Sequence, residues 1–192
     1  MLTVYVSTPN FWWRAPATHI RQWVPSDPDV DDGRTRWGDS QEQRWSLIAD
    51  IVAQVSQALA GDSWTADDDG DAVITVPAPD LRETEKRIVR SWFGAAMGVT
   101  IDPWWDTIVD GRHRLWRVLP LIGGTPVPIR GSALGCANEA GIEVLGPTWH
   151  ETFAAYPAQV KALGWFNQAD PVNVRFLQAM DSAARGEIPA PA

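Results

Sequence analysis

The chain has 192 residues, 24 acidic and 16 basic, and a formal net charge of −8 at pH 7. Apolar and charged fractions of 45% and 21% exclude wholesale disorder, and no apolar run approaches the length of a membrane span, so we expect one cytoplasmic domain over 1–192. The negative charge excludes a protein that coats DNA or binds anionic lipid, and the lone Cys136 excludes an internal disulfide and a multi-cysteine zinc site.

The first 80 residues are predicted to form two strands, a long loop and a helix. Alternating apolar residues predict strands over 2–6 and 72–76. Four prolines and two glycines predict an irregular loop over 9–39, which its tryptophans tether to the core. Ser40 begins a capping-box pattern before a helix that Gly61 closes. The apolar face of this helix recurs at steps of three and four residues and consists of Trp45, Ile48, Val52, Val55 and Leu59.

The centre of the chain is predicted to form a helix and then a strand, a short helix and a second strand. Asp80 and Glu83 have the spacing of an N-cap and its partner for the helix over 81–97. The unit that follows has a strand over 107–110, a helix over 111–122 that Pro120 ends early or kinks, a glycine turn and a strand over 126–129. Such a unit is of the βαβ type or belongs to a split sheet.

The C-terminal part, residues 132–185, is predicted to be helical. One helix covers roughly 147–163 and is interrupted near Pro157, and a second begins at Asp170 as N-cap. Residues 186–192 are predicted to form a frayed tail. The predicted fold class is α+β, or α/β: a small mixed sheet with a strand-helix-strand core, flanked by N-terminal and C-terminal helices.

The negative charge is concentrated in the first part of the chain. Residues 1–80 have 13 acidic and 5 basic side chains, a net charge of −8, and also hold many of the 12 tryptophans. Residues 81–131, the predicted core, have 5 acidic and 8 basic side chains, a net charge of +3. Two aspartate runs, over 27–32 and 67–71, contribute much of the excess. We prefer a solvated loop to a cation-binding loop, because the second run lacks the ligand spacing of an EF-hand.

A cationic turn is the strongest candidate site. Asp110, Gly111, Arg112, His113 and Arg114 lie where a predicted strand passes into a predicted helix. The first amides of a helix attract anions, glycine lets a ligand approach closely, and arginine offers a planar fork that suits phosphate oxygens. His113 can act as a donor or general acid near neutral pH, and Asp110 can orient an arginine, accept a ribose hydroxyl or hold a metal ion.

An alternative interpretation gives this turn no ligand. Arg112 and Arg114 would then be surface charges paired with Asp102, Asp106 or Asp110, and the helix would only anchor the core. The three histidines are far apart in sequence, so a three-histidine metal site is not expected, and the chain has no Walker-type loop or Gly-x-Ser-x-Gly elbow.

The stretch Thr107-Ile-Val-Asp-Gly-Arg-His-Arg-Leu-Trp, followed by Gly-Gly-Thr-Pro-Val-Pro-Ile, resembles the core of the ParB/sulfiredoxin superfamily. The resemblance covers about residues 107–131. It implies that Gly111, His113 and Arg114 contact phosphate and that Asp110 shapes the site, while Arg112 occupies a variable position. No cysteine lies beside Gly111, where sulfiredoxins place their thiol, so sulfiredoxin chemistry is not expected.

The sequence leaves two hypotheses about function, an enzyme that acts on phosphate groups and a non-catalytic binding protein. The resemblance implies a protein that binds a nucleotide (ATP, ADP or CTP) with Mg²⁺, or a nucleic-acid phosphate, with phosphoryl transfer or phosphodiester hydrolysis as its chemistry. Asp110, His113 and Arg114 are then the candidate catalytic residues, 111–114 bind the ligand, and no metal ligand or attacking base is assigned. The other hypothesis is a non-catalytic acidic protein of phage or mobile-element type that binds a protein partner as a nucleic-acid mimic. Clustered exposed tryptophans would favour that hypothesis, and buried tryptophans beside an open cationic pocket would favour the first.

Overall fold

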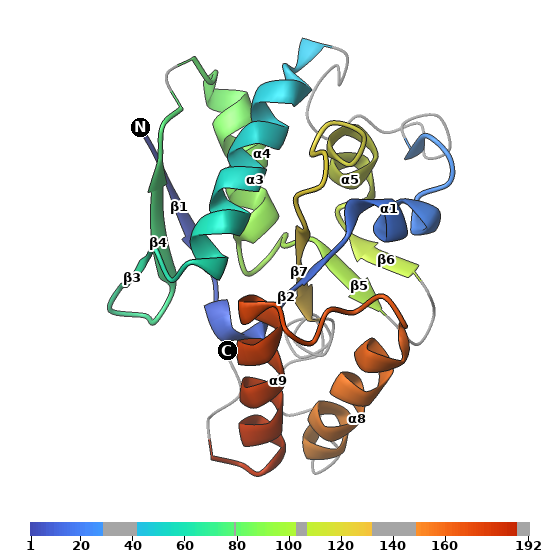
Figure 1. The fold of residues 1–192 in the computed structure, drawn as a ribbon. Coiled ribbons are helices and arrows are strands. Elements are labelled where there is room, and N and C mark those ends of the chain that lie inside the picture. The colour runs from blue at the N-terminus through green and yellow to red at the C-terminus, as the bar shows by residue number, and fades with distance from the viewer. Residues whose placement is uncertain (29–41, 79, 103–106, 132–148, 188–192) are drawn as a thin grey trace.

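A computed structural model describes residues 1–28, 42–78, 80–102, 107–131 and 149–187. The described residues form an α+β fold with two small sheets, one of three strands and one of four (Figure 1). This confirms the predicted fold class, although the strands divide over two sheets where the sequence predicts one. Ser40, Cys136 and most of the first aspartate run lie outside the described residues. No helix in the described ranges combines the length and the apolar character needed to span a membrane.

The three-stranded sheet is antiparallel, with strand order β1-β4-β3. β1 (Leu2–Val6) and β4 (Ala72–Val76) are the two strands predicted from alternating apolar residues, and β3 (Thr65–Ala66) adds a short edge. The inward side chains of the two long strands are all buried and pair in register, Leu2 with Val76, Val4 with Ile74 and Val6 with Ala72.

Two helices, α3 (Trp45–Ala60) and α4 (Glu83–Phe93), pack beside this sheet (Figure 1). α3 contacts β4 of the first sheet and β7 of the second, so it lies between the two sheets. Its predicted apolar face is confirmed, because Ile48, Val52, Val55 and Leu59 are buried. The helix begins at Trp45, with Arg44 at its N-cap and no side-chain cap.

The N-cap predicted for α4 is wrong by two residues. The helix begins after Arg82, whose N–H donates to the Glu85 carboxylate at 2.8 Å, so this pair replaces the predicted Asp80 and Glu83. Glu85 is buried and is also bound by Arg44, a contact between distant segments that local sequence spacing does not reveal.

The four-stranded sheet has strand order β2-β7-β5-β6, comprising β2 (Trp12–Ala15), β5 (Thr100–Asp102), β6 (Thr107–Asp110) and β7 (Val127–Gly131). β5 lies between β6 and β7, antiparallel to the first and parallel to the second. The predicted strand-helix-strand unit is therefore part of a split sheet and not a parallel βαβ unit.

The irregular loop predicted over 9–39 is wrong for its described part. β2 pairs antiparallel with β7, and its Trp12 and Trp13 are both fully buried. Three short helices flank β2, namely η1 (Pro9–Phe11), α1 (Ala17–Ile20) and η2 (Arg21–Trp23). Pro9 begins η1 and Pro16 is the N-cap of α1, and proline is tolerated at such positions.

The remaining helices are α5 (Arg112–Val118), α8 (Trp149–Ala162) and α9 (Pro171–Ala184). α5 ends before Pro120, as predicted, whereas α8 continues through Pro157 without the predicted interruption. The predicted N-cap of α9 is confirmed, because the Asp170 carboxylate accepts a hydrogen bond from the N–H of Val172 at 2.9 Å. α9 packs on α8 and β2 and so closes the lower part of the molecule in Figure 1.

Candidate functional site

Gly111 turns the chain from the end of β6 into α5. Its φ is +94°, in the left-handed region where residues with a Cβ are strained. Gly111 is also buried, and an added Cβ would lie 2.7 Å from Cγ2 of Val99. The backbone conformation and the close packing both require glycine at this position, so the start of α5 is fixed by its surroundings.

Arg114 points into the protein and not toward solvent. The residue is 2% exposed, and its guanidinium donates to Asp110 Oδ1 at 3.0 Å. It also donates to the carbonyl and hydroxyl oxygens of Ser91 in α4, at 2.5 and 3.1 Å. The resemblance to the ParB/sulfiredoxin superfamily implies that Arg114 contacts phosphate, but in the structure its guanidinium links the β6–α5 turn to α4. The alternative interpretation, in which Arg114 pairs with an aspartate, names Asp110 among its partners, and the structure has this pair. That interpretation places Arg114 at the surface, whereas the structure buries it.

Two arginines bind carbonyl groups at the C-terminal end of α4. The last carbonyls of a helix lack internal partners and carry partial negative charge. Arg114 donates a hydrogen bond to the carbonyl of Ser91, and Arg130 of β7 donates one to the carbonyl of Ala95, just beyond the helix. These contacts stabilise the helix end and fix the neighbouring β6–α5 turn against it.

Arg130 is a buried cation that the sequence analysis does not single out. It is 3% exposed, its Nε has no hydrogen-bond partner, and no carboxylate among the described residues pairs with it. Burial lowers the pKa of its guanidinium. Thr100 pairs in register with Arg130 of β7 on one side and with Asp110 of β6 on the other. Arg130 and Asp110 therefore lie on the same face of the sheet. The only sequence signal for this buried cation is an arginine within a short, otherwise apolar strand, 127–131.

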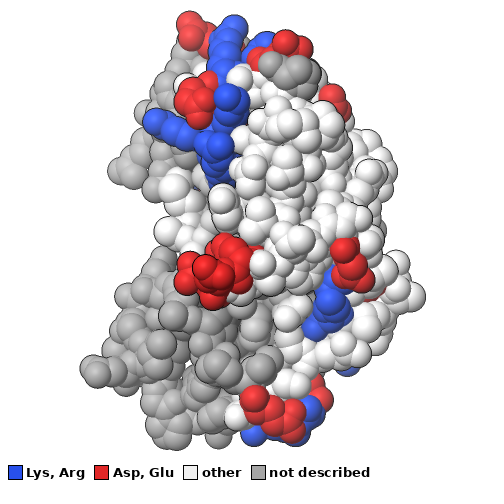
Figure 2. Space-filling view, turned by 90° about the vertical axis from the view of Figure 1, so that its left-hand side faces the viewer, with Lys and Arg blue, Asp and Glu red and all other residues white. Residues whose placement is uncertain are grey.

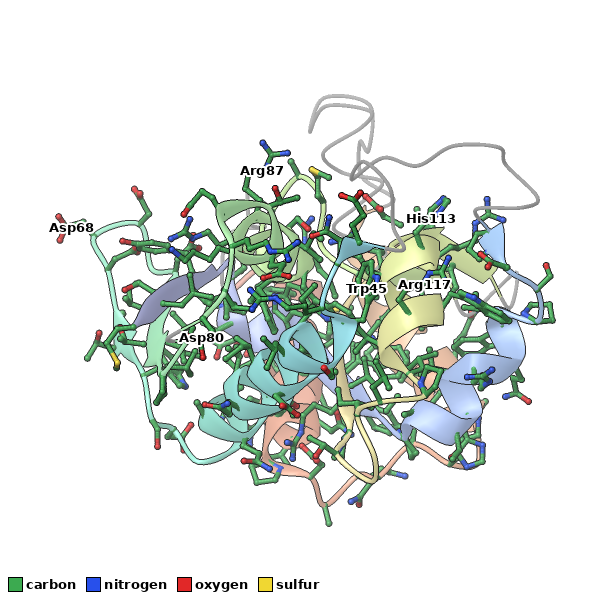
Figure 3. All side chains as sticks on the ribbon, turned by 90° about the horizontal axis from the view of Figure 1, so that it is seen from above. Trp45, Asp68, Asp80, Arg87, His113 and Arg117 are labelled. Carbon is green, nitrogen blue, oxygen red and sulfur yellow. The ribbon has the colours of Figure 1, made fainter. Side chains whose placement is uncertain are left out.

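Arg112 and His113 lie closer to the surface than Arg114. Arg112 is exposed and His113 is half-buried. Figure 3 labels His113 on α5 together with Arg117, which pairs with Asp27 at 3.4 Å. The first turn of α5 has no acidic residue. Arg112 and His113 therefore follow the glycine turn at or near the surface, whereas Arg114 is buried and forms an ion pair with Asp110.

The residues of this turn do not fit a magnesium site. Mg²⁺ is usually bound through one or two carboxylates together with ligand phosphates. Asp110 is the one carboxylate within 110–114, and it already accepts a hydrogen bond from the buried Arg114 cation. Across the part of the chain that the structure describes, no group of three His, Cys, Asp or Glu side chains could hold a metal ion.

The second aspartate run organises the turn between β3 and β4. Asp67 Oδ1 accepts hydrogen bonds from the N–H groups of Asp69 and Asp71 at 3.1 and 2.9 Å, and Asp71 Oδ1 accepts one from the N–H of Thr8 at 3.1 Å. Figure 2 shows one group of acidic side chains by itself near the middle of the face that carries the three-stranded sheet, while acidic and basic side chains lie side by side elsewhere on this face. Figure 3 shows Asp68 of this run at the opposite side of the molecule from His113. The acidic run therefore does not belong to the cationic turn of α5.

The tryptophans whose side chains the structure describes belong to the core or to its margin. Trp12, Trp13 and Trp92 are fully buried, and Trp23, Trp45, Trp64, Trp116 and Trp165 are half-buried. Trp165 stacks on His19, with ring centroids 5.3 Å apart, and on Trp13, with centroids 6.2 Å apart. This stack holds α1 and β2 against the segment between α8 and α9.

Comparison of the chain with known protein families, with curated proteins and with solved structures finds no match. The resemblance of residues 107–131 to the ParB/sulfiredoxin superfamily is neither confirmed nor refuted by these comparisons and stays a prediction.

Proposed function

We propose that the chain binds a phosphate-bearing ligand, a nucleotide or a nucleic-acid end, at the turn from β6 to α5. The observation that carries the proposal is that an exposed Arg112 and a half-buried His113 directly follow a glycine turn, on a helix with no acidic residue in its first turn. Arg112 can give two parallel hydrogen bonds to phosphate oxygens, and His113 can donate another.

Arg114 and Asp110 act in this proposal as positioning residues. Their ion pair, together with the bonds from Arg114 to Ser91, holds the turn against α4 before a ligand arrives. A site that is ordered in advance loses less conformational entropy on binding. This role differs from the catalytic one expected from the sequence. The proposal is confined to binding, because Asp110 is paired and no other residue of 110–114 is a carboxylate base.

The alternative function, a nucleic-acid mimic that binds its partner through tryptophans, requires exposed and clustered tryptophans. Every tryptophan whose side chain the structure describes is buried or half-buried. The tryptophans therefore give this alternative no support, and we do not adopt it.

Thermal unfolding tests the proposal with ATP, ADP, CTP and GTP, each with and without Mg²⁺. A ligand at 100 times its dissociation constant adds about 2.7 kcal/mol of stability, which for a domain of this size raises Tm by roughly 5–10 °C. Arg112→Met should abolish most of the rise, whereas Arg185→Met, an exposed arginine beyond α9, should not. The same rise with and without Mg²⁺ is expected, since Asp110 is paired. Unchanged melting with all four nucleotides would contradict the proposal.

A further inference from the structure

An apolar cavity of about 280 Å³ lies between the first half of α3 and the connection from β4 to α4. Its walls are mainly aliphatic, and Ile51, Ala78 and Leu81 are buried while Leu47 is half-buried. This volume is below the range of most cofactor and drug-sized pockets and suits one or two side chains. The residues around the cavity are Leu47, Asp50, Ile51, Gln54, Pro77, Ala78, Asp80 and Leu81.

Two exposed carboxylates, those of Asp50 and Asp80, stand at the rim of this cavity. Within the described residues, neither carboxylate makes a hydrogen bond or an ion pair. No lysine or arginine is among the described residues that line the cavity. The rim is therefore negative and the walls are apolar.

Two arginines close to Asp80, Arg44 and Arg82, are bound by other groups. Arg44 is close enough for the Asp80 charge to raise its pKa, but its first partner is the Glu85 carboxylate, and its further bond goes to the backbone carbonyl of Asp80. Arg82 donates to the carbonyl of Glu42. A cation from outside could therefore bind the rim carboxylates without displacing an internal partner.

We propose that this cavity docks a short basic segment of a partner protein, with an aliphatic side chain in the cavity and an adjacent arginine or lysine on Asp50 and Asp80. Burial of the aliphatic side chain supplies the apolar contribution, and hydrogen bonds from a cation to a carboxylate are stronger than those between neutral groups. The net charge of −8 over residues 1–80 attracts a basic partner and speeds its association. Figure 3 shows Asp80 well separated from His113, so this surface is distinct from the proposed phosphate site.

The test is a titration of the isotopically labelled full chain with the peptide acetyl-Arg-Leu-Arg-Leu-amide, followed through backbone amide chemical shifts. The largest shifts should fall on the amides of residues 47–54, 78, 80 and 81. Asp50→Asn/Asp80→Asn should weaken binding at least tenfold. The matched control Asp68→Asn/Asp69→Asn removes the same charge from the exposed β3–β4 turn and should change the affinity less than twofold. All four residues are at the surface, so the variants should keep the wild-type Tm, which is measured in parallel.

Three results would overturn the proposal. The first is the absence of shifts around the cavity at millimolar peptide. The second is equal weakening in both double variants, which would mean attraction to the overall negative charge only. The third is equally tight binding of acetyl-Glu-Leu-Glu-Leu-amide, which would mean that Asp50 and Asp80 do not select the ligand.

Discussion

Arg114 and Arg130 reach the same end of α4 from different elements, Arg114 from α5 and Arg130 from β7. Both are almost fully buried, and each donates to a backbone carbonyl at or just beyond the last turn of that helix. The candidate site is thus built on a helix end that buried cations stabilise. Two of the five residues of the cationic turn, Arg114 and Asp110, serve this support, and in the proposed phosphate site Arg112 and His113 are the residues that would face the ligand.

Arg114→Met should lower the free energy of unfolding by about 3 kcal/mol, because it leaves Asp110 without its cation and the Ser91 carbonyl without its donor. Arg112→Met, two residues away but exposed, should change it by less than about 0.5 kcal/mol. Urea denaturation followed by tryptophan fluorescence measures both values. A similar small loss in the two variants would show that Arg114 does not support the fold.

Gly111→Ala should destabilise the protein more than Gly123→Ala. Both glycines have positive φ, +94° and +64°, and an alanine in that region costs about 1–2 kcal/mol. A Cβ at Gly111 would in addition meet Val99 at 2.7 Å, whereas a Cβ at Gly123 would meet nothing within 4 Å. We expect a further loss of about 1–2 kcal/mol at Gly111 from this overlap. Equal losses, measured by urea denaturation, would mean that Val99 moves away freely.

The Glu85 carboxylate should make folding sensitive to acid. Hydrogen bonds from Arg44 lower the pKa of Glu85 from 4.5 to about 2, against the opposing effect of burial. Because this pKa is lower in the folded than in the unfolded protein, the stabilisation is complete above about pH 4.5 and is lost as the pH falls toward 2. It amounts to about 3 kcal/mol at most.

The variant Glu85→Gln isolates this contribution when the free energy of unfolding is measured between pH 7 and pH 2.5. The variant should be less stable than the wild type at pH 7, and the difference should shrink as the pH falls below 4.5. A difference that stays constant down to pH 2.5 would assign the acid sensitivity to other carboxylates.

Asp170→Ala should cost about 3–5 kcal/mol, because the carboxylate both caps α9 and pairs with Arg14 of β2 at 2.5 Å, largely out of contact with solvent. The comparison variant is Asp181→Ala on the same helix. Asp181 pairs with Arg185 in solvent and should contribute less than about 1 kcal/mol. Thermal unfolding of both variants provides the measurement, and a loss at Asp181 as large as that at Asp170 would refute the assignment.

The elements with strong local signals could be predicted from the sequence. The face of α3 repeats regularly over four turns, β1 and β4 alternate, and Asp170-Pro171 marks the start of α9. β2 could not be predicted, because its consecutive buried tryptophans, Trp12 and Trp13, follow no alternation and lie between prolines. β5 has three residues, too few for a pattern, and it is defined by its pairing with β6 and β7.

The position of the candidate site could also be predicted, but the roles of its residues could not. The sequence places Gly111 at a turn between a strand and a helix, and the structure confirms that turn. Whether an arginine faces a ligand or the core depends on its partners, and the partner of Arg114 in α4, Ser91, lies 23 residues away in sequence. The burial of Arg130 could not be predicted either, because it results from packing against the loop beyond α4.

The central claim, phosphate binding at the β6–α5 turn, is tested most directly by adding ATP to the labelled chain and following its backbone amide shifts. We predict saturable shifts that are largest at Gly111, Arg112 and His113, that need no Mg²⁺, and that weaken at least tenfold in Arg112→Met. Shifts that are largest elsewhere in the chain, or no saturable shifts at millimolar ATP, CTP or ADP, would contradict the claim.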